Sequence, residues 1–352
     1  MRLIELQNES DALQACDAAG RAVPDGNLRG WAALVTLPAL ADGLKHVGLQ
    51  VLRGEKAALA LGSLQQIWSA ARQFDGAREL LERAAAVESP ARASAWKLPR
   101  STLPARTALM GIVNATPDSF SDGGAYDPVQ QGLRLAEEGA DIIDVGGEST
   151  RPGAPAVSVE EERRRTEPVV RELVRRIKIP VSIDTTKPEV AAAAVDAGAE
   201  IVNVISGDLS GMPREASFVL MHMRGTPQDM QTRTRYDDLL GEVQAELLAK
   251  GPFDERIALD PGLGFAKTAE QNLLLLRRLR ELAQLGRPLV VGASRKSFIG
   301  KLTQRQPAER LSGSVAAAVV AVMNGAAVVR VHDVAATREA LSVADAVRTS
   351  AA

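Results

Sequence analysis

Polar and charged side chains recur where apolar, β-rich runs end in the C-terminal two thirds of this 352-residue chain. Asp184, Asn203 and Asp260 each end such a run, and Lys296 follows another. Carboxylates, an amide and an ammonium offer the acceptors and donors that pair with the edges of a polar heterocycle. A single Asp after a strand is usually a helix cap. Polar residues at the ends of several neighbouring strands favour a binding site instead.

The last apolar run carries a second group of polar side chains. Arg330 and His332 are two residues apart, so in a strand both side chains face the same way. With Asn114 and Ser and Thr hydroxyls they would hold a phosphate or its metal ion, because charged donors bind phosphate oxygens strongly. The alternative for His332 is a buried core histidine. Asp333 faces the other way, and we expect it to cap the following helix; alternation places His222 outside a barrel.

Short apolar runs alternate with amphipathic helical segments from Ile112 onward, which is typical of βα units around a parallel sheet. The predicted strands are 108–114, 141–146, 181–184, 200–204, 218–223, 257–260, 289–292 and 327–331. Eight strands over this length predict a (β/α)8 TIM barrel, whereas an open doubly wound sheet usually has fewer. In such barrels the chemistry lies at the carboxyl ends of the strands, where these polar residues fall.

The N-terminal part has a different pattern. Apolar runs at 31–37, 48–52 and 57–61 precede two amphipathic helices, at 64–74 and 77–87. We therefore predict a small N-terminal α/β domain of unknown role at 1–88, a linker rich in Pro, Ser and basic residues at 89–106, and the barrel at 107–352.

Composition limits the classes of partner. Lys plus Arg (42) nearly balances Asp plus Glu (44), for a net charge of −2, which gives no reason to expect nucleic acid or an anionic membrane as partner. Cys16 is the only cysteine, which excludes an internal disulfide and fits a reducing cytoplasm. The N-terminus lacks the pattern of a secretory signal, and no apolar run approaches a membrane span. We expect a soluble, cytoplasmic protein acting on small molecules.

These motifs together resemble the dihydropteroate synthase family over residues 107–348. The resemblance rests on Gly-Ile-Val-Asn followed by TPDSFSDGG, on DIIDVGGESTRPGA, and on MHMRGTP, LDPGLGFAK, SRKSFIG and RVHDV, each at the expected strand. It implies a transferase of folate biosynthesis. In this reaction 4-aminobenzoate displaces pyrophosphate from 7,8-dihydropterin pyrophosphate, with Mg²⁺ as cofactor, to give 7,8-dihydropteroate.

The resemblance also implies roles for individual residues. Asp184, Asn203, Asp260 and Lys296 would bind the pterin ring, with Met221, Gly264 and Phe265 lining its pocket; Arg330, His332 and Asn114 would bind the pyrophosphate and its Mg²⁺; Thr150, Arg151, Pro152, Phe120 and Ser297 would shape the aminobenzoate site. Lys296, Asp184, Arg330 and His332 are the expected catalytic group. Family members are commonly homodimers through helices late in the barrel, so a homodimer is expected.

One position departs from the family pattern. Val204 follows Asn203 where the family usually has Asp, and Asp208 is a candidate substitute. Two alternatives stay open at this point: a catalytically silent pterin-binding protein, and a pterin methyltransferase domain that passes a methyl group to a corrinoid partner. The pyrophosphate-binding residues favour the synthase, because the methyltransferase ligand carries no pyrophosphate.

Overall fold

The computed structural model describes residues 1–352 except 22–27, 75–76, 116–126, 150–154, 252 and 351–352. It divides into two compact units. The first contains Met1–Ala91, Asp237–Glu242 and Arg278–Gly286; the second contains Arg92–Tyr236, Val243–Arg277 and Arg287–Ala352.

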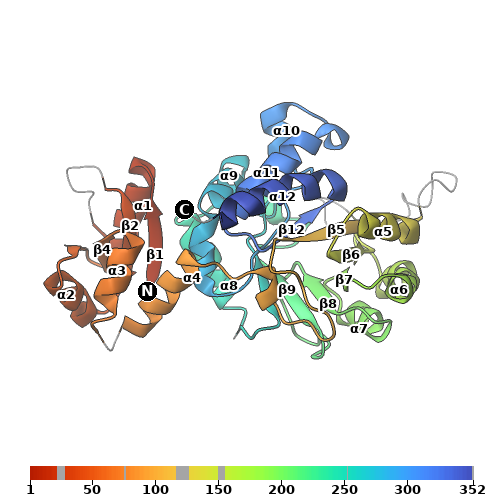
Figure 1. Ribbon diagram of the computed structural model, residues 1–352, viewed down its shortest axis with the longest axis horizontal. Coiled ribbons are helices and arrows are strands. Elements are labelled where there is room, and N and C mark those ends of the chain that lie inside the picture. Colours follow the sequence, from red (N-terminus) through yellow and green to blue (C-terminus); the bar gives the residue numbers. More distant parts are fainter. Residues whose placement is uncertain (22–27, 75–76, 116–126, 150–154, 252, 351–352) are drawn as a thin grey trace. The chain divides into compact units, whose positions relative to one another are not determined.

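The second unit is a closed parallel barrel (Figure 1). Its strands are β5 (Ala108–Asn114), β6 (Ile142–Gly146), β7 (Val181–Asp184), β8 (Ile201–Val204), β9 (Ser217–Met221), β10 (Ile257–Asp260), β11 (Val290–Val291) and β12 (Val328–Val331). Pairing runs from β10 through β9 down to β5, then to β12 and β11. A parallel bridge between Leu259 and Leu289 closes the ring. The predicted (β/α)8 barrel is confirmed.

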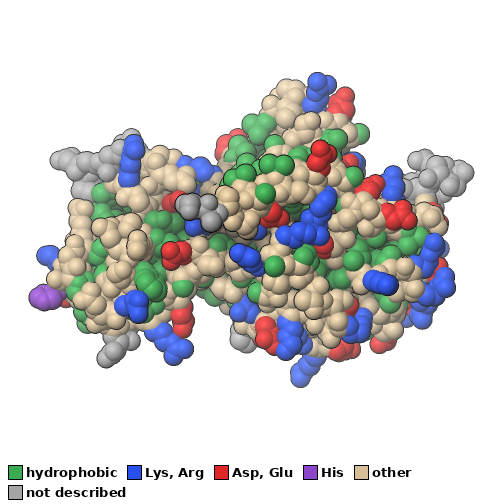
Figure 2. All heavy atoms as spheres, viewed as in Figure 1, with side chains coloured by type: hydrophobic (Ala, Val, Ile, Leu, Met, Phe, Trp, Pro, Cys, Tyr) green, Lys and Arg blue, Asp and Glu red, His purple; other side chains and the backbone are tan. Residues whose placement is uncertain are grey.

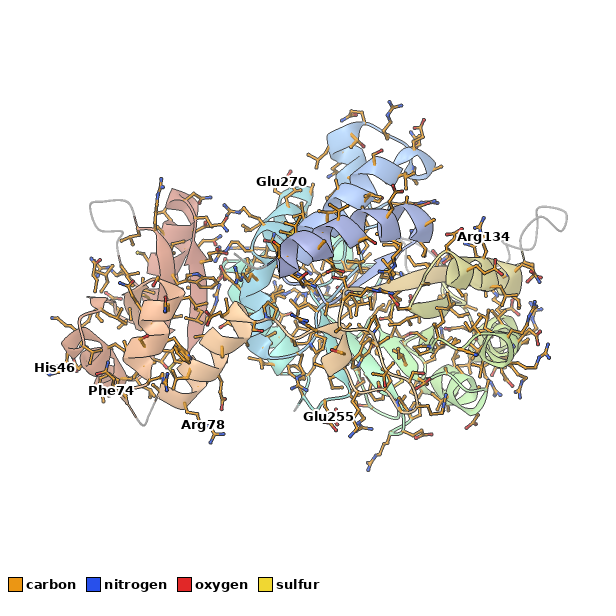
Figure 3. The ribbon with its side chains drawn as sticks, in the orientation of Figure 1. His46, Phe74, Arg78, Arg134, Glu255 and Glu270 are labelled. Atoms are coloured by element: carbon orange, nitrogen blue, oxygen red, sulfur yellow. The ribbon has the colours of Figure 1, made fainter. Side chains whose placement is uncertain are left out.

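Helices surround the barrel strands. They are α5 (Pro128–Glu137), α6 (Val159–Arg176), α7 (Pro188–Asp196), α8 (Leu239–Leu248), α9 (Ala269–Arg277), α10 (Ser297–Thr303), α11 (Leu311–Met323) and α12 (Val334–Thr349). Side chains such as Arg134 of α5 project from their outer faces (Figure 3). Gly139, Gly198 and Gly325 end α5, α7 and α11 with φ of 97°, 108° and 101°. Only glycine adopts this backbone readily, so each helix stops there and the chain turns into the next strand.

Residues 92–106 pack against the amino ends of the barrel strands. Trp96 is 1% exposed and lies in one apolar cluster with Ala108, Ile142 and Val290 at the starts of their strands. Its indole Nε1 donates to the carbonyl of Arg256 at 2.9 Å. This segment therefore closes the barrel floor, so any ligand enters from the carboxyl ends.

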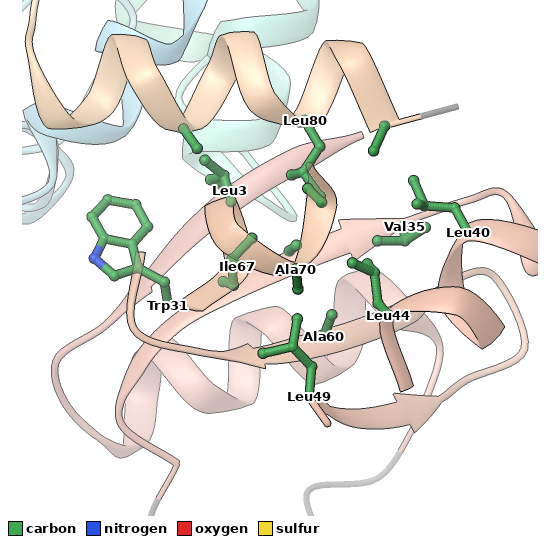
Figure 4. Close-up of a cluster of buried hydrophobic side chains, with 14 of the residues drawn as sticks. Leu3, Trp31, Val35, Leu40, Leu44, Leu49, Ala60, Ile67, Ala70 and Leu80 are labelled. Atoms are coloured by element: carbon green, nitrogen blue, oxygen red, sulfur yellow. The ribbon is translucent and has the colours of Figure 1, made fainter. Parts of the chain in front are cut away.

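The first unit contains an antiparallel sheet in the order β1 (Arg2–Leu6), β2 (Gly30–Val35), β4 (Ala58–Gly62), β3 (Gln50–Arg53). Buried residues of α2 (Pro38–His46), α3 (Leu64–Ala71) and α4 (Arg78–Glu88) share a core with one face of the sheet (Figure 4), whereas α1 (Glu9–Ala19) covers the other. The predicted α/β character is confirmed, and α3 and α4 match the predicted helices. Strand β1 and helices α1 and α2 were not predicted from the sequence.

Strand β1 is an edge strand whose free side is occupied by side chains from residues 278–286. Gln284 Oε1 accepts from the Leu3 amide at 2.9 Å, and its Nε2 donates to the Leu3 carbonyl at 3.0 Å. Glu281 Oε1 accepts from the Glu5 amide at 2.8 Å. These side-chain bonds occupy backbone groups of β1 that a neighbouring strand would otherwise bind. They therefore cover this edge of the sheet, which could otherwise pair with another chain.

Candidate active site

The strand ends of β6, β7, β8 and β12 bring two carboxylates, an amide and a guanidinium together. Arg330 Nε donates to Asp144 Oδ2 at 2.6 Å, and its Nη2 donates to Asp184 Oδ2 at 2.8 Å. Asn203 Nδ2 donates to the same Asp144 oxygen at 3.1 Å. Strand register explains the grouping, since Asp184 pairs with Asn203 on β8 and with Gly146 on β6.

Asp144 is the member of this group that the sequence analysis missed. It is fully buried, two residues before the end of β6 and therefore deeper in the barrel than Asp184. The signal was an acid inside an otherwise apolar run, Ile142–Gly146. A charge in that position is almost never buried without a partner, and Arg330 is the partner.

One guanidinium facing two carboxylates leaves this layer with an excess negative charge. Burial raises the pKa of Asp184 to about 7, against the opposing effect of Arg330 and with the help of nearby Asp144. The pKa of Arg330 is raised, because the two carboxylates outweigh the effect of its own burial. Arg330 thus stays a cation while Asp184 titrates near neutrality. Among the described residues, Oδ1 of Asp144 and Oδ1 of Asp184 are buried with no hydrogen-bond partner.

Lys296 lies beside the loop that follows β10. Its Nζ donates to the Leu263 carbonyl and lies 4.6 Å from the centre of the Phe265 ring. Gly264 has φ of 81°, and a Cβ there would meet Lys296 Cδ at 3.1 Å, so a side chain at this position would disturb the lysine. Burial lowers the pKa of Lys296 to about 8. Asp260, at the end of β10, accepts from the Gly262 amide at 2.7 Å, and burial raises the pKa of this carboxyl.

The turn after β11 adjoins His332. Ser294 Oγ lies 3.0 Å from His332 Nδ1, and it also accepts from the His332 amide at 3.3 Å. Arg295 adopts φ of 59°, a left-handed conformation that costs energy for a residue with a side chain. Its guanidinium holds Asp333 at 2.5 Å. Asp333 is the N-cap residue of α12, as predicted, but its carboxylate is directed to Arg295 and makes no cap hydrogen bond.

The remaining expected residues lie as follows. Asn114 is exposed at the end of β5, Met221 is buried at the end of β9, and Ser297 is the first residue of α10. Phe120, Thr150, Arg151 and Pro152 lie outside the described residues. A cavity of about 190 Å³ adjoins the β10 loop and is lined by Gln231, Thr234, Gly264, Lys267, Thr268, Ala269, Asn272, Ser297 and Lys301. Of the other histidines, His46 projects from α2 in the first unit (Figure 3). His222 packs outside the barrel, where its Nε2 lies 2.9 Å from Glu246 Oε2 of α8.

The loop after β8 does not use Asp208 in place of the usual acid. Asp208 is exposed and accepts from the Ser210 amide at 2.9 Å, which forms a local turn. Val204 is fully buried. Lys250 donates instead to the Ser206 carbonyl at 2.8 Å. Position 204 is therefore apolar in this chain. Lys250 binds the loop instead, through the backbone carbonyl of Ser206.

A second lysine joins the two stems of the loop after β6. Lys187 Nζ donates to Glu148 and, at 2.5 Å, to the fully buried Glu162. The other oxygen of Glu148 accepts from the Val157 amide at 3.1 Å. Residues on either side of 150–154 are thereby bound to one another.

The family described as "Pterin binding enzyme" matches residues 110–332, which include the parallel barrel and the polar groups at its mouth, so the chain is a pterin-binding enzyme. The dihydropteroate synthase of a Synechocystis strain is 50% identical over 260 residues, covering 68% of this chain and 90% of the relative. The Xanthomonas albilineans synthase with 4-aminobenzoic acid is 46% identical, with a TM-score of 0.64, and 70% of this chain and 94% of that one are covered.

The Burkholderia cenocepacia synthase complexed with 7,8-dihydropteroate is 41% identical, with a TM-score of 0.63, and 72% of this chain and 96% of that one are covered. The chain belongs to the dihydropteroate synthase family and is a transferase of folate biosynthesis. The two alternatives weighed above are not favoured, because the relatives are synthases that this chain covers over nine tenths of their length.

Proposed function

We propose that Asp184, Asn203, Asp260 and Lys296 bind the dihydropterin ring at the carboxyl ends of β7, β8 and β10. The observation that carries this proposal is the buried Oδ1 of Asp184, which has no hydrogen-bond partner among the described residues. A buried acceptor of this kind costs free energy until a donor arrives, and the amino and ring N–H groups of a pterin are such donors. Lys296 supplies a donor for the ring's acceptor atoms.

The walls of the ring pocket follow from the same elements. Met221 at the end of β9 and the Gly264–Phe265 pair of the β10 loop supply apolar surface beside the polar groups. Such a combination of apolar walls and few oriented polar groups is what a flat heterocycle requires. Phe265 additionally lies against the ammonium of Lys296, which limits the positions that this lysine can take.

Arg330, His332 and Asn114 bind the pyrophosphate and its Mg²⁺ in this proposal. Nε and Nη2 of Arg330 donate to carboxylates, and a guanidinium carries further N–H donors that suit a phosphate oxygen. No group of three His, Cys, Asp or Glu among the described residues can hold a metal. Mg²⁺ is commonly bound by one or two protein oxygens together with substrate phosphates, and the side-chain oxygen of Asn114 would supply one. When bound, the ion neutralises charge on the departing pyrophosphate.

The reaction needs no protein nucleophile. The C–O bond between the pterin methylene and pyrophosphate breaks first, the 4-aminobenzoate nitrogen then bonds to that carbon, and one amine proton is released. Arg330 and His332 stabilise the leaving group's charge, and the carboxylates of Asp184 and Asp260 face the cation left on the pterin. Ser297, with Phe120, Thr150, Arg151 and Pro152 of the loops outside the described residues, shapes the amine site.

We also propose a cytoplasmic homodimer. Val343 and Val347 of α12 are 66% and 58% exposed, and Val320 and Met323 of the adjacent α11 are each 45% exposed. Figure 2 shows apolar side chains on the surface of these two helices. A cluster of exposed apolar residues is typical of a protein interface. None of the described helices is both long enough and apolar enough to span a membrane.

The assay combines the purified protein, dihydropterin pyrophosphate, labelled 4-aminobenzoate and Mg²⁺, and follows pyrophosphate and dihydropteroate. Lys296→Ala and Asp184→Ala should lose product formation, whereas Lys178→Ala, an exposed lysine outside the site, should keep it. Unchanged turnover in both site variants would reject the residue assignment. Pterin binding without turnover in the wild type would reject catalysis.

A further inference from the structure

Lys267 is a buried cation that the reaction described above does not use. It is 3% exposed, although lysine is rarely buried without partners. Its ammonium reaches three acceptors: the Gly262 carbonyl at 3.2 Å, the Phe265 carbonyl at 3.0 Å and His222 Nδ1 at 2.9 Å. An ammonium has three N–H donors, so each donor has one acceptor.

This arrangement defines the tautomer of His222. Nδ1 accepts from Lys267, so the ring proton lies on Nε2, which is 2.9 Å from Glu246 Oε2 and donates to it. Burial, with the positive charge of Lys267, lowers the pKa of His222 to about 2, so the ring stays neutral. Glu246 is in turn bound by Arg224. Lys267, His222 and Glu246 form a fixed chain from the β10 loop to α8.

The β10 loop needs such a support because of its backbone. Gly262, Gly264 and Ala266 have φ of 71°, 81° and 51°. Glycine accepts these angles readily, but alanine adopts them only at an energetic cost and where the surroundings hold it. Ala266 is directly followed by Lys267, whose ammonium turns back to two carbonyls of the same loop.

The held loop is the one that touches Lys296. The Leu263 carbonyl accepts from Lys296, and the Phe265 ring lies against its ammonium. Phe265 is also one of the two loop residues whose carbonyls bind Lys267. A displacement of this loop would therefore move Lys296 and the apolar wall of the ring pocket together.

We infer that Lys267 is a positioning residue for pterin binding. Its ammonium holds the β10 loop in the conformation with positive φ at Gly262, Gly264 and Ala266, and this conformation places Phe265 and Lys296 against the pterin ring. This inference rests on the proposed pterin site. It assigns to the Lys267–His222–Glu246 chain a role in substrate affinity, in addition to any part in folding.

The charge on Lys267 depends on pH near neutrality. Burial lowers its pKa to about 7, and the positive charges of Lys296 and Arg224 act in the same direction, whereas Asp260 and Glu246 act against it. His222, which contacts the Lys267 ammonium, carries no charge. As pH rises through this pKa, Lys267 loses one of its three donors and the loop loses one bond. Pterin affinity should then fall before Lys296, with a pKa of about 8, is deprotonated.

The first test needs no substrate. Hydrogen exchange is measured at the amides of Gly264 and Phe265, which donate to Asn272 Oδ1 and the Gly262 carbonyl. Lys267→Met should speed their exchange about tenfold or more, while the Gly207 amide, which donates to the Val204 carbonyl elsewhere, stays unchanged. Lys178→Met serves as the matched control. Unchanged exchange at Gly264 and Phe265 in Lys267→Met overturns the inference, whatever the activity.

The second test measures affinity for dihydropterin pyrophosphate against pH. In Lys267→Met the KM for the pterin substrate should rise about tenfold or more, the KM for 4-aminobenzoate should change less, and the alkaline fall in affinity should move from about pH 7 toward 8. If the wild type binds pterin and this profile does not move, the inference is wrong. If the wild type binds no pterin, the proposed function fails, and the exchange measurement still decides the loop's support.

A second pair of variants covers the case in which Lys267→Met does not fold. His222→Asn keeps an acceptor near the position of Nδ1, whereas His222→Leu removes it. Loss of that acceptor destabilises the charged ammonium, so His222→Leu should move the alkaline fall in affinity to lower pH and speed exchange at Gly264. His222→Asn should stay nearer the wild type in both measurements. Equal behaviour of the two variants would contradict the inference.

Discussion

Arg330 Nε lies 2.6 Å from Asp144 Oδ2 in the buried layer of the barrel, and Asp144 is fully shielded from solvent. This pair orients the guanidinium from below, so that Nη2 reaches Asp184 at the mouth. The first prediction concerns this support. Asp144→Ala should lower the free energy of unfolding by about 3 kcal/mol, because it leaves a buried guanidinium with one carboxylate fewer. Urea unfolding followed by circular dichroism measures it. Asp144→Asn, which keeps an acceptor, should cost less, and equal losses would contradict a specific role of the charge.

The second prediction is a pH dependence that originates at Asp184. Its pKa of about 7 lies above the usual value for Asp, so the folded state favours the protonated acid. Pterin N–H groups bind an ionised acceptor more strongly, so ionisation of Asp184 should raise affinity as pH increases from about 6 to 7, whereas loss of charge on Lys267 in the same range should lower it. The rise is therefore measured in Lys267→Met, where the opposing effect is absent. Titration calorimetry across this range tests it. The rise should be absent in Asp184→Asn, which cannot ionise, and its persistence there would assign it to another group.

The same shift has a consequence for stability. Because the folded-state pKa of Asp184 is raised, its contribution is complete below the unfolded value of about 4 and is lost as pH rises through about 7. Asp184→Asn should therefore become relatively more stable than the wild type as pH rises from 5 to about 8. Urea midpoints at the two pH values measure the difference. A constant difference would show that Asp184 does not titrate there.

Lys296 should contribute mainly to pterin affinity. Lys296→Met keeps much of the side-chain volume and removes the charged donor, which is worth about 1.5–3 kcal/mol, or about 10- to 100-fold in the dissociation constant. Direct titration with a pterin provides the value. Lys178→Met is the matched exposed control. Wild-type affinity in Lys296→Met would remove this residue from the ring site.

Trp96 should affect stability and leave the active site unchanged. It fills the closed floor of the barrel, so Trp96→Ala should lower the free energy of unfolding by about 3 to 5 kcal/mol through the cavity it leaves. Trp96→Phe loses the bond to the Arg256 carbonyl but keeps a ring, and it should cost less. Both KM values should match those of the wild type for any folded protein. A large rise in KM would mean that the floor and mouth are coupled.

The proposed dimer predicts a change of mass in solution. Val343→Glu places a charge on the exposed apolar face of α12 and should convert the dimer to a monomer. Light scattering after size-exclusion chromatography reads the mass directly. The control is Gln50→Glu, which adds a charge at an exposed position of β3 in the first unit. A wild-type monomer, or a Val343→Glu dimer, would reject this interface.

Local sequence determined the barrel. A short apolar run ending in Asp, Asn or Gly predicts a strand buried on both faces, and Gly139, Gly198 and Gly325 mark the turns from three helices into the next strands. For this reason the sequence alone places Asp184, Asn203, Asp260 and Arg330 at or near strand ends. The N-terminal helices α1 and α2 were harder to find, because α1 is only weakly amphipathic and α2 is short and begins with Pro38.

Only the tertiary structure decided which of these groups are bonded to one another. Asp144 pairs with Arg330 across 186 positions of sequence, and Lys267 meets His222 across 45. Such pairs depend on strand register and on the burial that forces each charge to find a partner, and neither is encoded in local spacing. The sequence therefore predicted the polar residues at the mouth of the barrel. The fold determined the buried contacts that hold these residues in place and shift the pKa values of their charged groups.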